Sequence, residues 1–146
     1  MKRKSVMFTM AAALLFGASA LAQKTKIVPA AVATALKAKY PQATKVTWEK
    51  EKGNFEANWG GKSGEDMSVV FTPAGAFVEQ VEAIEPAALP AAATAYIKSH
   101  YAGKKVAEAG KVTDASGKIT FEAEIKKMEV VFDEKGNFIK TETEND

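Results

Sequence analysis

The sequence predicts an α+β fold in which one unit, a helix followed by four antiparallel strands, occurs twice. The Ala-rich segments 28–41 and 89–102 carry a proline, a lysine and a tyrosine at matching positions, sixty-one residues apart. The segments 68–79 and 129–140 repeat each other at the same spacing, each with a turn between two apolar stretches. One helix on four strands buries little apolar surface, whereas two such units side by side make a larger core. We therefore expect one roughly eight-stranded antiparallel sheet with both helices on one face.

Each unit opens with a helix. Pro29 and Pro90 suit the first helical turn, where the missing N–H removes no hydrogen bond. Pro41 and Gly103 follow the two segments and end the helices. Apolar residues recur at helical spacing in both segments and define the face that packs on the sheet. These residues are Val32, Leu36 and Tyr40 in the first helix and Ala93, Ile97 and Tyr101 in the second.

Four short strands follow each helix. Apolar and polar residues alternate along them, which is typical of a sheet with one covered face, and Trp48 and Trp59 fall on the covered side. Glycine-containing turns such as 52–54 separate the strands. The expected strands are 45–51, 55–59, 67–71 and 76–84 in the first unit, and a weaker strand near Val106, 119–125, 128–132 and 138–144 in the second.

The chain divides into a leader and two repeats. A basic start at residues 2–4, an apolar run at 6–16 and the small residues Ala20 and Ala22 form the pattern of a secretory signal peptide. The apolar run is shorter than the roughly 20 residues that span a bilayer. We expect a signal peptide at 1–22 cleaved after Ala22, a first repeat at 23–85 and a second at 86–146 that share one core. The cleaved chain would be periplasmic or secreted, without a membrane anchor.

Charge and cysteine content exclude several classes of function. Cleavage would remove three basic residues and no acidic ones, which changes the formal charge from +2 to −1. A nearly neutral chain gives no electrostatic argument for binding nucleic acid. The chain has no cysteine, so thiol catalysis and cysteine-ligated zinc are excluded, and the fold must be stable without disulfides.

Four segments carry a family resemblance: "YPQATKVTWEKEKGNFEANW" at 40–59, "SVVFTPAGAFVEQ" at 68–80, "LPAAATAYIKSHY" at 89–101 and "FEAEIKKMEVVFDEKGNFIKTE" at 121–142. Together they resemble the PepSY-like, beta-lactamase-inhibitor-like family of exported bacterial proteins, which is typical of Bacteroidetes-type bacteria. The resemblance implies an eight-stranded antiparallel sheet with helices on one face. It brings no catalytic residues. Distant namesakes bind and inhibit enzymes through the open sheet face, which favours a binding role on fold analogy alone.

No residue set indicates catalysis, a cofactor or a metal centre. His100 is the only histidine, and it has neither a second histidine nor a cysteine to join it as a metal ligand. We expect it to be exposed near the end of the second helix. The segments 114–117 and 133–137 superficially resemble calcium loops but lack the full series of spaced oxygen ligands, so hairpin turns are favoured. The protein is therefore expected to be non-enzymatic, with no cofactor.

The outward-facing residues suggest two binding hypotheses. Acidic residues support the second of them, a site for a small molecule or a cation. Glu56, Glu122, Glu124 and Glu129 fall on the outward side of their strands. If they converge, they can bind a small molecule or a cation, although alternation alone favours ordinary solvated positions. This is the second hypothesis.

The first hypothesis is a protein- or peptide-binding face. Val70 and Val131 match across the repeats and point outward by strand parity. Phe77 and Phe138 also match, but parity leaves their direction open because their strands are apolar on both faces. With both phenylalanines outward, the four residues would form an apolar patch; if neighbouring segments cover the strands, no patch exists. The candidate partner-binding residues are Val70, Phe77, Val131, Phe138, Glu56, Asn58, Glu122 and Glu124, and the expected partner is an unidentified envelope or extracellular protein or peptide, with enzyme inhibition as one form of binding.

Overall fold

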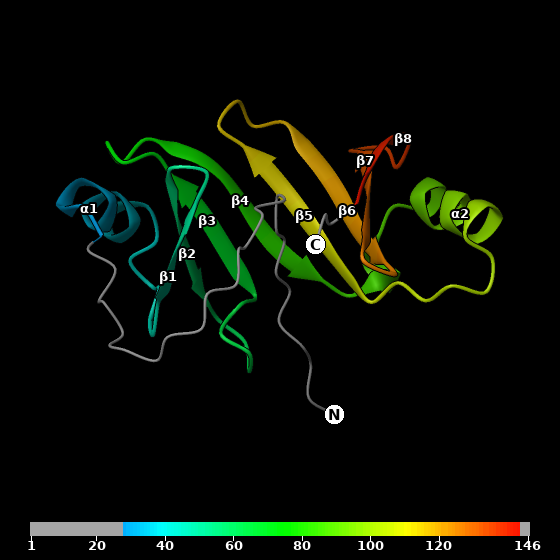
Figure 1. Cartoon of the computed structure of the whole chain (residues 1–146), viewed down its shortest axis with the longest axis horizontal. Helices are drawn as coiled ribbons and strands as arrows, with labels where there is room; N and C mark the ends of the chain where they lie inside the picture. The colour runs from blue at the N-terminus through cyan, green and yellow to red at the C-terminus, as the bar shows by residue number, and fades with distance from the viewer. Residues whose placement is uncertain (1–27, 144–146) are drawn as a thin grey trace, which may run out of the picture.

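The computed structural model describes residues 28–143, whose strands form one open, eight-stranded antiparallel sheet (Figure 1). The strands lie in the sheet in the order in which they occur in the sequence. The helical elements are α1 (Ala30–Lys39), the 3-10 turn η1 (Pro86–Ala88) and α2 (Ala91–His100). The strands are β1 (Thr47–Glu51), β2 (Asn54–Trp59), β3 (Met67–Phe71), β4 (Phe77–Ile84), β5 (Glu108–Asp114), β6 (Ile119–Ile125), β7 (Met128–Asp133) and β8 (Phe138–Thr143). The predicted fold class is confirmed.

The helices α1 and α2 cover the same face of the sheet at its two ends (Figure 1). Strand β4 shows this, because Gln80 and Ile84 lie on one side of it. Gln80 accepts a 2.5 Å hydrogen bond from the hydroxyl of Tyr40, the residue that ends α1. Ile84 packs on the cluster under α2. Residues four apart on a strand share a face, so both helices lie on that side of the sheet.

Each helix covers its own cluster of buried residues. The predicted helix faces are confirmed, because Val32, Leu36, Ala93 and Ile97 are all buried. The first cluster contains Val32, Leu36, Tyr40, Phe55, Ala57, Trp59, Val69 and Phe71, with Trp48 partly buried against it. The second contains Leu89, Ala93, Ile97, Ala109, Ala123, Ile125, Val130 and Phe132.

Matching glycines hold the β3–β4 and β7–β8 turns against the starts of the two helices. Gly75 and Gly136 have φ of +83° and +86°, which favours glycine. A Cβ atom at Gly75 would lie 2.7 Å from the carbonyl oxygen of Ala31, and one at Gly136 would lie 2.8 Å from the backbone nitrogen of Ala93. Both positions therefore need glycine for conformation and for space.

The first strand of the second repeat differs from the prediction. Strand β5 begins at Glu108, and Val106 precedes it and packs against the cluster under α2. The small residues Ala109 and Gly110 give little strand signal in the sequence. They are held in β5 by pairing with β4 on one side and β6 on the other.

Phe77 and Phe138 do not join an outward-facing patch. A register irregularity at Val70/Phe71, and another at Val131/Phe132, changes which residues share a face, so Phe77 pairs with Phe71 and Phe138 pairs with Phe132. The ring of Phe77 meets that of Phe71 edge-on, at 6.3 Å between centroids. The ring of Phe138 stacks on Tyr96 of α2 at 4.7 Å. Both phenylalanines therefore lie on the helix side of the sheet.

Candidate functional site

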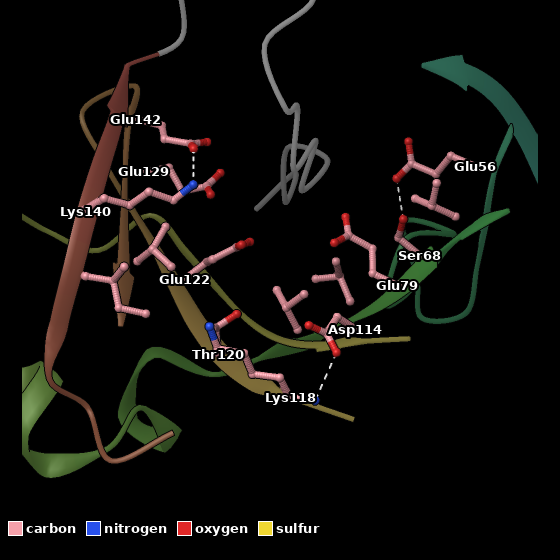
Figure 2. Close-up of a pocket in the computed structure, with 15 residues that line it drawn as sticks. Glu56, Ser68, Glu79, Asp114, Lys118, Thr120, Glu122, Glu129, Lys140 and Glu142 are labelled. Atoms are coloured by element: carbon pink, nitrogen blue, oxygen red, sulfur yellow. Dashed lines mark hydrogen bonds and ion pairs between the residues drawn. The ribbon is translucent and has the colours of Figure 1, made fainter. Parts of the chain in front are cut away.

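The face of the sheet away from the helices is hollowed. Side chains from strands β2 to β8, together with Lys118 of the β5–β6 turn, line a cavity of about 330 Å³, which we call the hollow (Figure 2). Its lining residues are Glu56, Ser68, Val70, Glu79, Val81, Val112, Asp114, Lys118, Thr120, Glu122, Glu129, Val131, Ile139, Lys140 and Glu142.

The register of the strands brings these residues together. Glu56 pairs with Val70, Val70 with Glu79, and Glu79 with Asp114, so four side chains from β2 to β5 form one row. Directly opposed residues in antiparallel strands share a face of the sheet. Two further rows contain Val81, Val112 and Thr120, and Glu122, Val131 and Lys140.

The floor of the hollow is aliphatic. Val81, Val112 and Val131 are exposed by only 7%, 7% and 5%, although they point away from the helices. Val70 is partly buried, and Ile139 is 43% exposed. The hollow therefore offers apolar contact in its depth and an accessible apolar side chain on β8.

The walls of the hollow carry more negative than positive groups. Two lysines, Lys118 and Lys140, are among the lining residues. The six acidic lining residues are Glu56, Glu79, Asp114, Glu122, Glu129 and Glu142. Acidic groups of both repeats thus face one cavity, so the potential in the hollow favours a cation.

In the wall from the first repeat, Ser68 supports a carboxylate. Its hydroxyl donates a hydrogen bond to Oε1 of Glu56 (Figure 2). Burial raises the pKa of Glu56. The hydrogen bond from Ser68 lowers this pKa, and repulsion from Glu49, Glu79 and Glu65 raises it further. The hydroxyl therefore helps Glu56 to carry its charge in the hollow.

The wall from the second repeat concentrates acidic groups. Figure 2 shows Glu122 pointing into the hollow, with Glu129, Lys140 and Glu142 beside it. Burial, followed by repulsion from Glu129, Glu79 and Glu142, raises the pKa of Glu122 to about 9, although Lys140 lowers it. Glu122 therefore holds a proton at neutral pH in the free protein.

The charged groups at the rim are held by local contacts. Lys140 forms an ion pair with Glu142, and this hydrogen bond raises the pKa of the lysine. The carboxylate of Asp114 accepts hydrogen bonds from the hydroxyl of Ser116, at 2.6 Å, and from the backbone N–H of Lys118, at 3.0 Å. These bonds lower the pKa of Asp114, so it stays charged at the rim.

Half of the predicted binding residues meet in the hollow. Val70, Val131, Glu56 and Glu122 line it, as strand parity predicted. Asn58 and Glu124 are not among its lining residues. Asn58 is buried opposite Ser68, and Glu124 pairs with Glu108 and Glu129 at the next row of the sheet. Phe77 and Phe138 lie on the other face, as described above.

The prediction of binding residues missed much of the hollow. Glu79, Val81 and Val112 lie on strands whose register could not be known from the sequence. The positions of Lys140 and Ile139 depend on the irregularity in the β7–β8 pairing. The available signal was the strand parity of β5 and β6, which places Val112, Asp114 and Thr120 on the helix-free face.

His100 and the two calcium-like segments each make local contacts. His100 stacks on Tyr96 at 3.9 Å between ring centroids and is exposed. In both hairpin turns an aspartate accepts hydrogen bonds from the turn itself: Asp114 as above, and Asp133 from the backbone N–H groups of Lys135 and Asn137. Their interpretation as hairpin turns is confirmed.

Residues 28–143 contain neither a metal-binding cluster nor a membrane-spanning helix. No group of three or more histidine, aspartate or glutamate side chains in this part of the chain is arranged to hold a metal ion. No helix between these limits has both the length and the apolar character needed to cross a bilayer.

Comparison with known proteins gives a family. The sequence profile of the family described as beta-lactamase-inhibitor-like, PepSY-like matches residues 18–79 and again residues 62–140. The chain belongs to this family. The double match fits the repeat found in the sequence. The family resemblance stated from the sequence is thereby confirmed. No curated protein matches the chain.

Solved structures share the fold. A Bacteroides eggerthii protein described as periplasmic superposes with a TM-score of 0.71 at 22% identity, covering 80% of this chain and 88% of its own. A DUF2874 family protein from Bacteroides ovatus gives 0.69 at 20% identity, with coverage of 80% and 87%. A BLIP-like protein from Bacteroides fragilis gives 0.66 at 23% identity, with coverage of 84% and 92%. At these identities, the likeness establishes the fold.

Proposed function

We propose that this protein is an exported, non-enzymatic binding module that holds a protein or peptide partner in the hollow of its sheet. One observation carries the proposal: an aliphatic floor enclosed by charged walls, built by strands of both repeats on the face that the helices leave open. An apolar centre with a polar rim is the usual anatomy of a protein interface. The description of the family as inhibitor-like supports a binding role.

A non-enzymatic role is supported by the chemistry of the lining residues. The hollow contains Ser68, whose hydroxyl is engaged with Glu56, and neither a histidine nor a cysteine is among the lining residues. His100, the one histidine of the chain, belongs to α2 on the opposite face. A serine nucleophile needs a neighbouring base that takes its proton and is itself oriented by a third group, and this pairing with Glu56 is not that arrangement.

Export to the periplasm is part of the proposal. The leader at 1–22 lies outside the described residues, so its support comes from the sequence pattern and from relatives described as periplasmic. Mass spectrometry of the protein recovered from the periplasm of an expression host tests it. The expected amino terminus is Gln23, and a chain that retains residues 1–22 would contradict the proposal.

Selection from a random peptide library displayed on phage tests the binding role. The purified protein is expected to enrich peptides that bind it in solution. Val70→Lys, which places a long charged side chain on the floor, should reduce their affinity at least about tenfold, a loss of 1.4 kcal/mol. The control is Ala115→Lys, in an exposed turn between β5 and β6. Equal binding by both variants, or no enriched peptide, would contradict the proposal.

A small molecule or cation is the second candidate ligand. The observation that favours it is the size of the hollow, about 330 Å³, which lies at the lower end of the range for small-molecule pockets, together with its six acidic residues. Thermal unfolding with calcium and with small amines is the test. A rise in melting temperature that Glu122→Gln abolishes would support this candidate, since ligand binding to the folded state stabilises it.

A further inference from the structure

The two repeats place different residues at one matching position of the hollow. Glu56 and Ser68 lie on β2 and β3, and their counterparts by repeat alignment are Glu122 and Glu129 on β6 and β7. In the first repeat, a hydroxyl donates a hydrogen bond to the carboxylate. In the second, an acidic residue replaces that hydroxyl, so two carboxyl groups occupy the place of a donor and an acceptor.

Charge in this part of the hollow favours an incoming cation. The groups of the second-repeat wall are Glu122, Glu129, Glu142 and Lys140, three acidic residues and one lysine. Lys140 forms an ion pair with Glu142. Because Glu122 holds a proton at neutral pH, the formal charges of Glu129, Glu142 and Lys140 leave this wall with a net charge of −1.

We infer that the partner in the hollow is a polypeptide segment that places a lysine or arginine side chain between Glu122 and Glu129. The inference rests on the proposed function and specifies its partner. The chemistry matches, because an alkyl stem can lie on the aliphatic floor at Val112 and Val131 while the charged head reaches the two carboxyl groups. A partner segment with glutamate between Glu122 and Glu129 would be repelled by the acidic groups of this wall.

Protonation adds a measurable consequence. The pKa of Glu122 is raised, first by burial and then by Glu129, Glu79 and Glu142, so a cation that enters displaces its proton. The other charged groups that line the hollow are Glu56, Asp114, Lys118 and Lys140. Binding of a basic segment at neutral pH should therefore release a proton to the buffer.

The experiment uses the peptides selected on the purified protein. Enriched sequences are expected to contain lysine or arginine, and replacing that residue by norleucine should weaken binding at least about tenfold at low salt. Glu129→Ser copies the first repeat and Glu122→Gln removes the titrating group, and each should lower the affinity for the basic peptide several-fold. The control is Glu134→Gln in the exposed β7–β8 turn, which removes one acidic group, as Glu129→Ser does. Calorimetry in buffers of different ionisation enthalpy counts the released proton.

The outcomes separate this inference from the proposed function. Selected peptides that bind equally well with lysine or norleucine would overturn the inference and leave the proposed function intact. Lysine amide alone binding as tightly as the peptide would overturn it in favour of a small cationic ligand. If no peptide of any charge binds, both fail. Affinity that falls with norleucine, with Glu129→Ser and with added salt supports the inference, because charge pairs at a partly exposed site are screened.

Discussion

The hydroxyl of Ser68 donates a hydrogen bond to the carboxylate of Glu56 across strands β2 and β3. In the second repeat, Glu129 occupies the position that matches Ser68, and it lines the hollow together with Glu122. The repeats have thus kept their strands and changed their chemistry. The difference places a carboxyl group beside Glu122 where the first repeat has a hydroxyl beside Glu56.

Replacing Ser68 by alanine should destabilise the protein. The pKa of Glu56 is raised by burial and lowered by this hydroxyl, so the variant has a still higher pKa and a less favourable carboxylate at pH 8. We expect a loss of about 1–2 kcal/mol in the free energy of unfolding, measured in urea. The matched control is Ser99→Ala, whose exposed hydroxyl bonds to the carbonyl of Tyr96 at the end of α2. Equal losses in the two variants would contradict the role of Ser68.

Replacing Gly136 by alanine should be more costly than replacing Gly117. Both residues have positive φ, +86° and +84°, so alanine strains the backbone by about 1–2 kcal/mol at either site. At Gly136 the new Cβ also meets the backbone nitrogen of Ala93 and the Cβ of Pro90, both at 2.8 Å, whereas nothing lies within 4 Å at Gly117. We expect an additional loss of about 1–3 kcal/mol for Gly136→Ala, because backbone at the start of α2 must move. Similar melting temperatures for the two variants would show that the turn does not pack on the helix.

Substitution of Phe138 should affect stability, whereas substitution of Ile139 should affect binding. They are similarly exposed, 41% and 43%, but Phe138 stacks on Tyr96 and Ile139 lines the hollow. Phe138→Ala should lower the free energy of unfolding by about 1 kcal/mol or more and leave peptide affinity unchanged. Ile139→Ala should weaken peptide binding with a smaller effect on unfolding. If Phe138→Ala weakened peptide binding and Ile139→Ala did not, Phe138 and not Ile139 would belong to the binding face.

The repeat and the alternation of residues made most of the fold predictable. Val32 and Leu36, and Trp59 on β2, could be placed in the core because helix and strand periods are properties of the local sequence. Strand β5 was less clear, since Ala109 and Gly110 are poor strand formers. Pairing on both sides keeps them extended, and such long-range pairing leaves no trace in the local sequence.

The hollow was predictable only in part. Val70 and Val131 followed from parity, but the row that joins Glu79 to Asp114 exists because β4 pairs with β5, which the sequence does not specify. The direction of Phe138 depends on one irregularity in the β7–β8 register. A shift of one residue reverses every later side chain, so parity fails wherever a bulge occurs.

The stability of the protein should fall as the pH rises, because of Glu122. Its pKa is raised from the ordinary value of 4.5 to about 9 in the folded chain, first by burial and then by Glu129, Glu79 and Glu142, although Lys140 lowers it. Between these two values the folded state holds a proton that the unfolded state releases. The stabilising contribution is therefore complete below pH 4.5 and is lost as the pH rises toward 9.

Glu122→Gln tests this directly, because glutamine stays neutral at every pH and keeps the shape of the protonated carboxyl. We expect the variant to match the parent protein near pH 4.5 and to become more stable than it by about 1–3 kcal/mol near pH 9, measured by urea unfolding across the range. Glu134→Gln, in the exposed turn, should show no such divergence. A difference between Glu122→Gln and the parent that stays constant with pH would mean that Glu122 titrates normally, and the displaced proton expected on binding a basic segment would then be absent too.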